Sequence, residues 1–220
     1  VTPSGPLYTA FVQPDAATSV VAFDLGSGEV HASLKTAAIE DSRFVRDAGL
    51  DRVRQALGAV AAPTDVAASR GVWARAFGSR ADFDGDGNAA QVDRSISGLF
   101  IGADTVVADD WRVGALAGYS HSDVKLDTPA SSGTTDAYHL GVYGGRQWGA
   151  LGLRAGAAWT DGSVDTQRTV DVAGMAGQPT ASYHAQTAQA FGELGWRIDA
   201  GGGALGPFAG VAHVNLRTEG

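Results

Sequence analysis

Two different periodicities divide the chain. Between positions 27 and 57, apolar residues recur at three- and four-residue steps, as on one face of an α-helix. After position 70, apolar and polar residues alternate with a period of two, as in strands that have one apolar face. The sequence therefore predicts a helix about 45 Å long at 1.5 Å per residue, followed by a sheet.

The predicted helix has suitable residues at both ends. Ser27 can cap its start, Glu29 lies in its first turn, and Gly58 offers a stop. Small and oppositely charged residues cover most of its circumference. This surface suits a polar tunnel better than an apolar core, although an amphipathic helix on a soluble domain shows the same periodicity. A short helix is also predicted from Pro14 to Leu25.

Seven strands are predicted in the second part of the chain. In the fourth strand, Leu140 and Val142 share an apolar face opposite His139, and in the sixth, Leu194 lies opposite Glu193. A soluble β-sandwich and a membrane β-barrel both produce this alternation. The predicted strands are 71–80, 92–106, 111–123, 135–147, 150–160, 183–198 and 204–217.

Three features favour the membrane barrel. The strands reach a dozen residues or more, longer than is usual in soluble sheets. Short turns near 108–110, 148–150 and 199–203 alternate with long polar loops near 81–91, 124–134 and 161–182. Aromatic residues lie near strand ends, as in the interfacial girdles of barrels. They are Trp111, Tyr119, Tyr138, Trp148, Trp159 and Trp196.

Composition narrows the function classes. The net charge of -8 argues against a nucleic-acid partner, and the absence of Cys removes disulfides and thiolate chemistry. The 31 glycines suit a sheet with close strand packing. Uninterrupted apolar runs fall far short of the roughly 18 residues of a membrane helix.

Several sequence blocks resemble those of one known family. Ser27–Ser33 and Glu40–Asp47 resemble the linker helix of the monomeric autotransporters of type V secretion, and Val72–Gly78 resembles the first barrel strand of that family. Further blocks are similar to its third, fourth, sixth and seventh strands. They are Trp111–Gly114, Gly118–Ser120, Tyr138–Gly145, Thr187–Gly195 and Pro207–Gly210.

The resemblance implies an all-β transmembrane antiparallel barrel with the long helix in its lumen. About 12 strands are expected in the full protein and about seven here, so the barrel in this sequence is expected to be incomplete. Residues 1–26 would be the end of the passenger and linker, 27–58 the helix threading the lumen, 59–70 a connector, and 71–220 the N-terminal part of the barrel.

The same resemblance implies a function in protein export. The domain would anchor an N-terminal passenger in the outer membrane of a Gram-negative bacterium and export it, with the start of the linker toward the cell surface. Its implied partners are the passenger, outer-membrane lipid and the barrel assembly machinery.

Charged and polar side chains that face the lumen need partners, because burial of an unpaired charge is costly. We therefore expect a set of contacts between the helix and the inner wall of the barrel. The candidate residues are Glu40, Arg43, Arg46, Asp47, Arg75, His139, Arg154, Glu193 and Arg197.

No catalytic, metal or cofactor site is predicted. The run Asp82–Asn88 resembles the start of an EF-hand calcium loop, but both flanks are predicted strands instead of helices. Some autotransporters cleave their own linker, but the Asn-Asn pair that one such group uses is absent. Two alternatives stay open: a passive pore or adhesin barrel, and a barrel enzyme. An enzyme would use rim residues such as Asp82, Asp84, His121 and Asp161.

Overall fold

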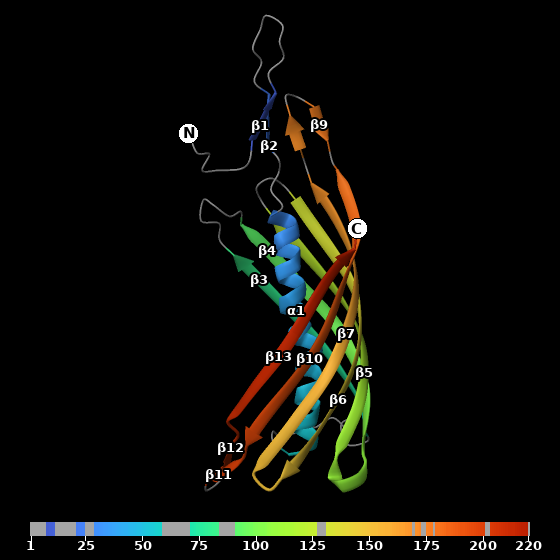
Figure 1. The fold of residues 1–220 in the computed structure, drawn as a ribbon, viewed down its shortest axis with the longest axis vertical. Coiled ribbons are helices and arrows are strands. Elements are labelled where there is room, and N and C mark those ends of the chain that lie inside the picture. The colour runs from blue at the N-terminus through green and yellow to red at the C-terminus, as the bar shows by residue number, and fades with distance from the viewer. Residues whose placement is uncertain are drawn as a thin grey trace, which may run out of the picture.

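One long helix and one large antiparallel sheet make up most of the structure (Figure 1). The computed structural model describes residues 8–11, 21–24, 29–58, 71–83, 91–126, 131–168, 170–172, 175–177, 179–200 and 203–219. The helix is α1 (Glu29–Ala56). The strands of the sheet are β3 (Val72–Phe83), β4 (Val92–Val106), β5 (Arg112–Leu126), β6 (Ser131–Trp148), β7 (Leu151–Arg168), β10 (Thr180–Trp196) and β13 (Phe208–Glu219).

Helix α1 ends where the sequence predicts. Gly58 has a φ of 71°, a left-handed conformation that glycine adopts without steric cost. The amide of Leu57 still donates to the Val53 carbonyl at 2.9 Å, and the amide of Gly58 donates to the Gln55 carbonyl at 3.1 Å. The predicted cap Ser27 lies outside the described residues. No helix in the described part of the chain is long and apolar enough to cross a membrane.

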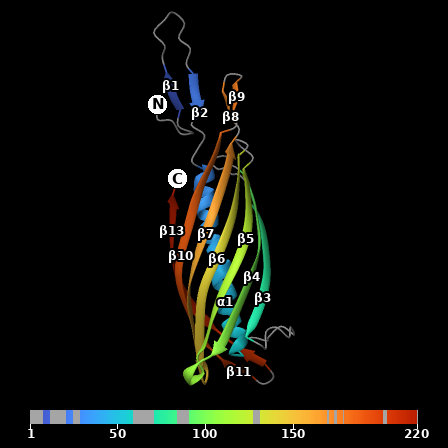
Figure 2. The ribbon, with the colours of Figure 1, turned by 90° about the vertical axis from the view of Figure 1, so that its right-hand side faces the viewer.

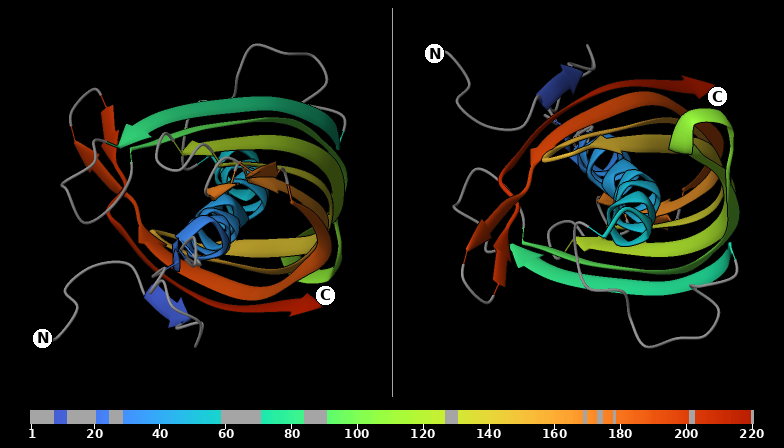
Figure 3. Two further views of the ribbon diagram at one scale, coloured as in Figure 1. Left: turned by 90° about the horizontal axis from the view of Figure 1, so that it is seen from above. Right: turned by 90° about the horizontal axis from the view of Figure 1, so that it is seen from below.

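The seven strands pair with their neighbours in chain order, β3-β4-β5-β6-β7-β10-β13, and every pairing is antiparallel. The sheet is strongly tilted and curves around α1 (Figures 2 and 3). Strands β3 and β13 pair with no strand of the sheet on their outer sides. The structure is therefore an open wall with a helix on its concave face.

The two faces of the wall differ as the alternation predicts. Leu140, Val142 and Leu194 point away from the helix and are 53–59% exposed. Their neighbours on the opposite face, His139 and Glu193, are buried under α1. The predicted assignment of these apolar residues to the outer face is confirmed.

Aromatic side chains on the concave face lie over glycines of the neighbouring strand. A Cβ added to Gly118 would overlap the Phe100 ring, which continues across Gly118 to an edge contact with His139 at 5.4 Å. The absence of a side chain at Gly118 thus lets the Phe100 ring of β4 lie across β5 and contact β6. Five such pairs are directly opposite in register. They are Trp73 and Gly102, Phe77 and Gly98, Phe100 and Gly118, Tyr143 and Gly114, and Phe191 and Gly156.

Helix α1 packs on this face through apolar side chains at helical spacing. Val45 and Val53 are fully buried in one cluster with Phe100 and other residues of the wall. Nearer the helix start, Leu34 and Ala37 pack in a second cluster with residues of β5, β7 and β10. The aromatic rings also form a row from the helix into the wall, because Phe44 stacks on Phe77 and Phe77 on Phe100.

Several predicted boundaries are wrong. The helix predicted over 14–25 is contradicted, because β2 (Val21–Asp24) pairs with β1 (Tyr8–Phe11). The predicted strand 204–217 is divided at Gly206 and Pro207. Pro207 has no backbone N–H and therefore cannot donate a hydrogen bond to a neighbouring strand. The part before this break is β12 (Gly203–Leu205), which pairs with β11 (Ile198–Ala200).

The predicted long loops are also shorter than expected. Much of 124–134 and 161–182 continues the ladder, because β5 extends to Leu126, β7 to Arg168, and β10 begins at Thr180. Between β7 and β10 lies a further ribbon of β8 (Val170–Val172) and β9 (Met175–Gly177). At the opposite end, the β4–β5 turn contains a single 3₁₀ turn over Ala108–Asp110. At the end of the sheet where β5, β7 and β10 extend, polar residues interrupt the apolar alternation, but the strands continue because their backbone pairing continues.

Replacing Gly118 with alanine tests the close packing of the wall. The new Cβ would overlap Phe100 and lie 2.8 Å from the Leu99 carbonyl oxygen. We expect Gly118→Ala to lower the free energy of unfolding by about 1–3 kcal/mol. Urea unfolding of the full-length protein in lipid vesicles, followed by tryptophan fluorescence, measures this change.

Gly78→Ala is the matched control. A Cβ at Gly78 meets only the Ile96 carbonyl oxygen, at 3.6 Å, which is ordinary contact. We expect this substitution to change the free energy of unfolding by less than about 1 kcal/mol. Equal effects of the two substitutions would contradict the packing argument.

Candidate functional site

The candidate site is the contact between α1 and the concave face of the sheet (Figure 3). Helix α1 carries arginines and carboxylates that no longer face bulk water there. A charge removed from water is stable only when a partner of opposite sign and further hydrogen bonds replace its hydration. The partners of these charges therefore identify the contacts that hold α1 against the wall.

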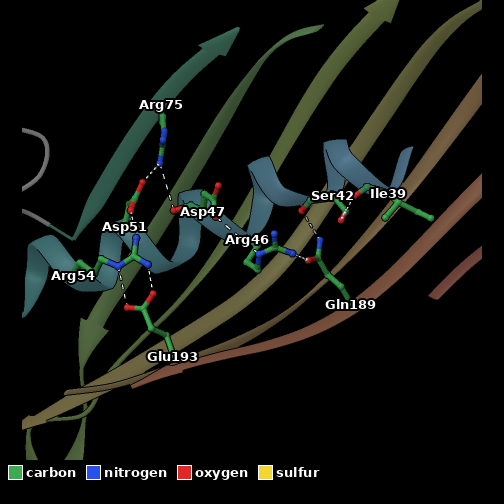
Figure 4. Close-up of polar contacts among 9 residues, drawn as sticks. All are labelled: Ile39, Ser42, Arg46, Asp47, Asp51, Arg54, Arg75, Gln189 and Glu193. Carbon is green, nitrogen blue, oxygen red and sulfur yellow. Dashed lines mark hydrogen bonds and ion pairs between the residues drawn. The ribbon is translucent and has the colours of Figure 1, made fainter. Parts of the chain in front are cut away.

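One ion cluster is centred on Glu193 of β10, which is 4% exposed. Arg54 of α1 approaches both carboxylate oxygens, with its Nε 3.0 Å from Oε1 (Figure 4). Arg154 of β7 donates to the same Oε1 at 2.7 Å. Arg54 also pairs with Asp51 one turn earlier, and Asp51 receives Arg75 of β3 at 2.7 Å. The chain of charges connects two distant strands through the helix.

A second cluster is centred on Asp104 of β4, whose side chain is fully buried. Arg52 of α1 donates from Nε to Oδ2 at 2.5 Å and from Nη2 to Oδ1 at 3.2 Å. Arg112 of β5 pairs with the same carboxylate. The hydroxyl of Tyr143 donates to Oδ2 at 3.3 Å and accepts the indole N–H of Trp73 at 2.6 Å. Side chains of α1, β5 and β6 thus meet at one carboxylate of β4, and β3 is joined to them through Tyr143.

The two clusters hold opposite sides of the helix. Successive residues of an α-helix are rotated by about 100°, so Arg52 and Arg54 point about 200° apart. Arg52 reaches β4, while Arg54 reaches β10, near the other edge of the sheet. Rotation or translation of α1 would break one or both pairs. The arrangement fixes the position of the helix.

The first half of α1 is held by Arg94 of β4. This guanidinium donates to Glu40 at 2.6 Å and to the Ala37 carbonyl at 3.0 Å, and it also pairs with Asp41. On the opposite wall, the side-chain amide of Gln189 donates to the Ser42 carbonyl at 2.8 Å. These contacts extend the polar interface along the helix.

Most of the predicted contact residues lie at this interface. Arg75, Arg154 and Glu193 belong to the cluster around Glu193, and Glu40 pairs with Arg94. Arg46 of α1 lies 3.4 Å from the side-chain oxygen of Gln189.

The remaining predicted residues make different contacts. The Asp47 side chain lies 3.9 Å from Arg46, and its backbone carbonyl accepts Arg75 at 3.4 Å. Arg43 lies over the Phe44 ring on α1 itself. Arg197 was expected to face inward as part of the sixth strand, but it follows the end of β10 and its side chain is 45% exposed. From there it donates to the Gly58 carbonyl at 2.8 Å, just beyond the helix end.

His139 lies inside the wall without a charged partner. Its ring nitrogens are 2.9 Å from the hydroxyls of Ser120 and Thr160 on the neighbouring strands. A cavity of about 50 Å³ lies beside it, between the first half of α1 and the wall, and is lined by hydroxyl and apolar groups. The described residues contain no group of three or more metal-ligating side chains. Residues 84–88 of the calcium-like run lie outside the described residues.

The Asp104 cluster and Arg94 are not among the contacts predicted from the sequence. Both residues lie on the concave face of β4, an even number of positions from buried Phe100. That parity was available in the sequence as a signal. The pairing of Arg52 with Asp104 could not be predicted, because the two residues are 52 positions apart along the chain.

Comparison with known sequences identifies the family. Residues 72–220 match the family model described as the autotransporter beta-domain. Two extracellular serine proteases of Serratia marcescens are 37% and 36% identical over 194 and 196 residues, which is 88% of this chain each time. The chain spans 18% of the length of either protease. Outer membrane protein B of Rickettsia prowazekii (strain Madrid E) is 26% identical over 143 residues, 64% of this chain and 9% of that protein.

Solved structures show the same architecture. The beta domain of the Bordetella autotransporter BrkA matches with a TM-score of 0.52 at 26% identity, over 67% of this chain and 57% of that chain. The transport unit of the autotransporter AIDA-I from Escherichia coli matches with a TM-score of 0.54 at 16% identity, which shows the fold alone; the match covers 77% of this chain and 61% of that one. The wall is thus part of an outer-membrane β-barrel of a Gram-negative bacterium, and the chain belongs to the autotransporter β-domain family.

Proposed function

We propose that this chain supplies the lumen helix and seven strands of a translocator that anchors a passenger in the outer membrane and exports it. The observation that carries this proposal is the attachment of α1 to opposite sides of the wall by Arg52 and Arg54. A passive pore or an adhesin barrel has no need of such a helix. A linker that remains in the lumen after export needs to be held in place.

The lengths of the connections support an orientation. Strands β4 and β5 are joined by a 3₁₀ turn, and β6 and β7 by Gly149 and Ala150, at the same end of the sheet (Figure 1). Bacterial barrels have short turns at the periplasm. Strand β3 then starts at the periplasmic end. The connector proposed for 59–70, which lies outside the described residues, would start at the same end. The start of α1, with a passenger end proposed for 1–26, faces the cell surface.

Further strands close the barrel in this proposal. Backbone groups without partners cost several kcal/mol each in lipid, and β3 and β13 each have an unpaired edge in the sheet. The matched structures extend beyond the match, which covers 57% and 61% of them. A total of about 12 strands would complete the lumen around α1. Outer-membrane lipid and the barrel assembly machinery are the partners that insertion of such a sheet requires.

We assign no catalysis to this chain. The Serratia relatives are named proteases, but the match covers 18% of their length. A protease activity would belong to a passenger and not to the wall. His139, the buried histidine of the wall, contacts hydroxyls and has no ion-pair contact with a carboxylate. We therefore propose that the linker helix is retained, without self-cleavage by this histidine.

Deletion of the helix tests its place in the lumen. We compare the passenger-free form of the full-length protein with the same form lacking residues 29–56, each in planar lipid bilayers. Single-channel conductance should rise in the deleted form, because a helix of about 10 Å diameter no longer fills the lumen. Equal conductance with and without the helix would place α1 outside the pore.

Glu193→Gln tests the attachment of the helix. This change leaves Arg154 buried without a counter-charge and Arg54 with Asp51 alone, so the free energy of unfolding should fall by about 3 kcal/mol or more. The matched control is Arg75→Gln, which removes an ion pair with Asp51 in which the arginine side chain is 42% exposed. Its expected cost is below about 1 kcal/mol. Urea unfolding in vesicles measures both, and a larger loss for Arg75→Gln would refute the assignment.

A further inference from the structure

The outer face of the wall contains a shallow apolar groove that the proposed function does not use. It crosses β4 to β7 and has a volume of about 860 Å³. Most of the side chains that line it are small. The outward-facing residues that line it include Trp111, Val113, Val142, Gly144, Ala155 and Ala157.

Arg146 lies at the end of this groove, two residues beyond Gly144 on the same face of β6. Its guanidinium carbon is 5.3 Å from the centre of the Trp148 ring, and that ring makes an edge contact with Trp111 at 5.7 Å. The Nε of Arg146 is buried and has no hydrogen-bond partner, which is also true of the Nε atoms of Arg94 and Arg154. None of the ion pairs among the described residues includes Arg146, whereas Arg52, Arg54, Arg94 and Arg154 all have carboxylate partners.

The depth of Arg146 in the membrane makes its lack of a partner informative. Trp111 and Trp148 lie at the end of the wall with the short turns, which in the orientation proposed above is the interface of the periplasmic leaflet. A lipid-facing arginine is costly within the hydrocarbon and extends its charged group to the headgroup region. The phosphates of phospholipids are the anions at that depth, and a guanidinium binds them through paired N–H donors.

We propose that Arg146 and the adjoining groove bind one glycerophospholipid of the periplasmic leaflet. The phosphodiester accepts hydrogen bonds from the Arg146 guanidinium beside Trp148, and the glycerol lies near Trp111. One acyl chain then runs toward the middle of the membrane against Ala155 and Ala157, where the small side chains leave room. Arg146 lies where the headgroup of such a lipid would be, and the apolar groove lies where its acyl chain would be.

Native mass spectrometry of the full-length protein in mild detergent, titrated with palmitoyl-oleoyl phosphatidylglycerol, tests the site. The wild type should retain one lipid, and Arg146→Gln should weaken its apparent affinity by about tenfold, the usual effect of losing a charge-assisted hydrogen bond. Ala155→Leu should also weaken binding, because it fills the groove and leaves the arginine intact.

Arg217→Gln is the matched control, since it removes the same charge from an exposed position near the far end of β13. We expect wild-type affinity from this variant. Equal losses in Arg146→Gln and Arg217→Gln would overturn the proposal in favour of net charge alone, and unchanged binding in Arg146→Gln would overturn it directly. Arg146-dependent binding of lipopolysaccharide in place of phospholipid would also overturn it, because that lipid occupies the outer leaflet.

Heat-modifiable migration on a gel shows whether each variant is folded. Should Arg146→Gln fail to fold, Arg146→Lys replaces it in the titration. Lysine keeps the positive charge but lacks the paired donors of the guanidinium, so a smaller loss of affinity is expected. Wild-type affinity in Arg146→Lys together with unchanged binding in Ala155→Leu would count against the site.

Discussion

The pairing of helix arginines with carboxylates of the wall is the interaction on which the arrangement depends. Asp104 and Glu193 are carboxylates buried beneath α1, and each pairs with one arginine of the helix and one of the wall. Arg52 and Arg54 are positive charges that lose their hydration when α1 enters the concave face. Each group makes the burial of the other possible. The helix and the inner face of this autotransporter β-domain are therefore complementary parts of one interior.

A thin wall allows this interior to form. Aromatic rings lie flat over glycines of the next strand, as Phe100 does over Gly118, so the side chains occupy little depth. The same device brings α1 close to β6, where a Cβ on Gly145 would lie 2.7 Å from Val53. The glycines that lie against these side chains thus have a packing role, and a wall of larger side chains would leave less room for a helix.

The sequence predicts the elements and faces well because both follow from local periodicity. The alternation around Leu140 and His139 gives the outer and inner faces, and Gly58 gives the helix end. The partners of Arg52 and Arg54 could not be predicted, because they depend on strand tilt and on the rotation of the helix. Strand ends such as Leu126 were missed for another reason. Polar residues stop the apolar pattern at the membrane boundary, while backbone pairing continues into water.

The separation of partners along the chain sets an order of assembly. Each hairpin of the wall pairs neighbours in sequence, so strands can be added one after another without threading. Arg52 and Asp104 are 52 residues apart and can meet once β4 is in place, whereas Arg54 and Glu193 are 139 residues apart and must wait for β10. If strands are added in chain order, the helix is captured first by one hairpin and immobilised only later. Between these two events it is tethered on one side, with freedom to slide.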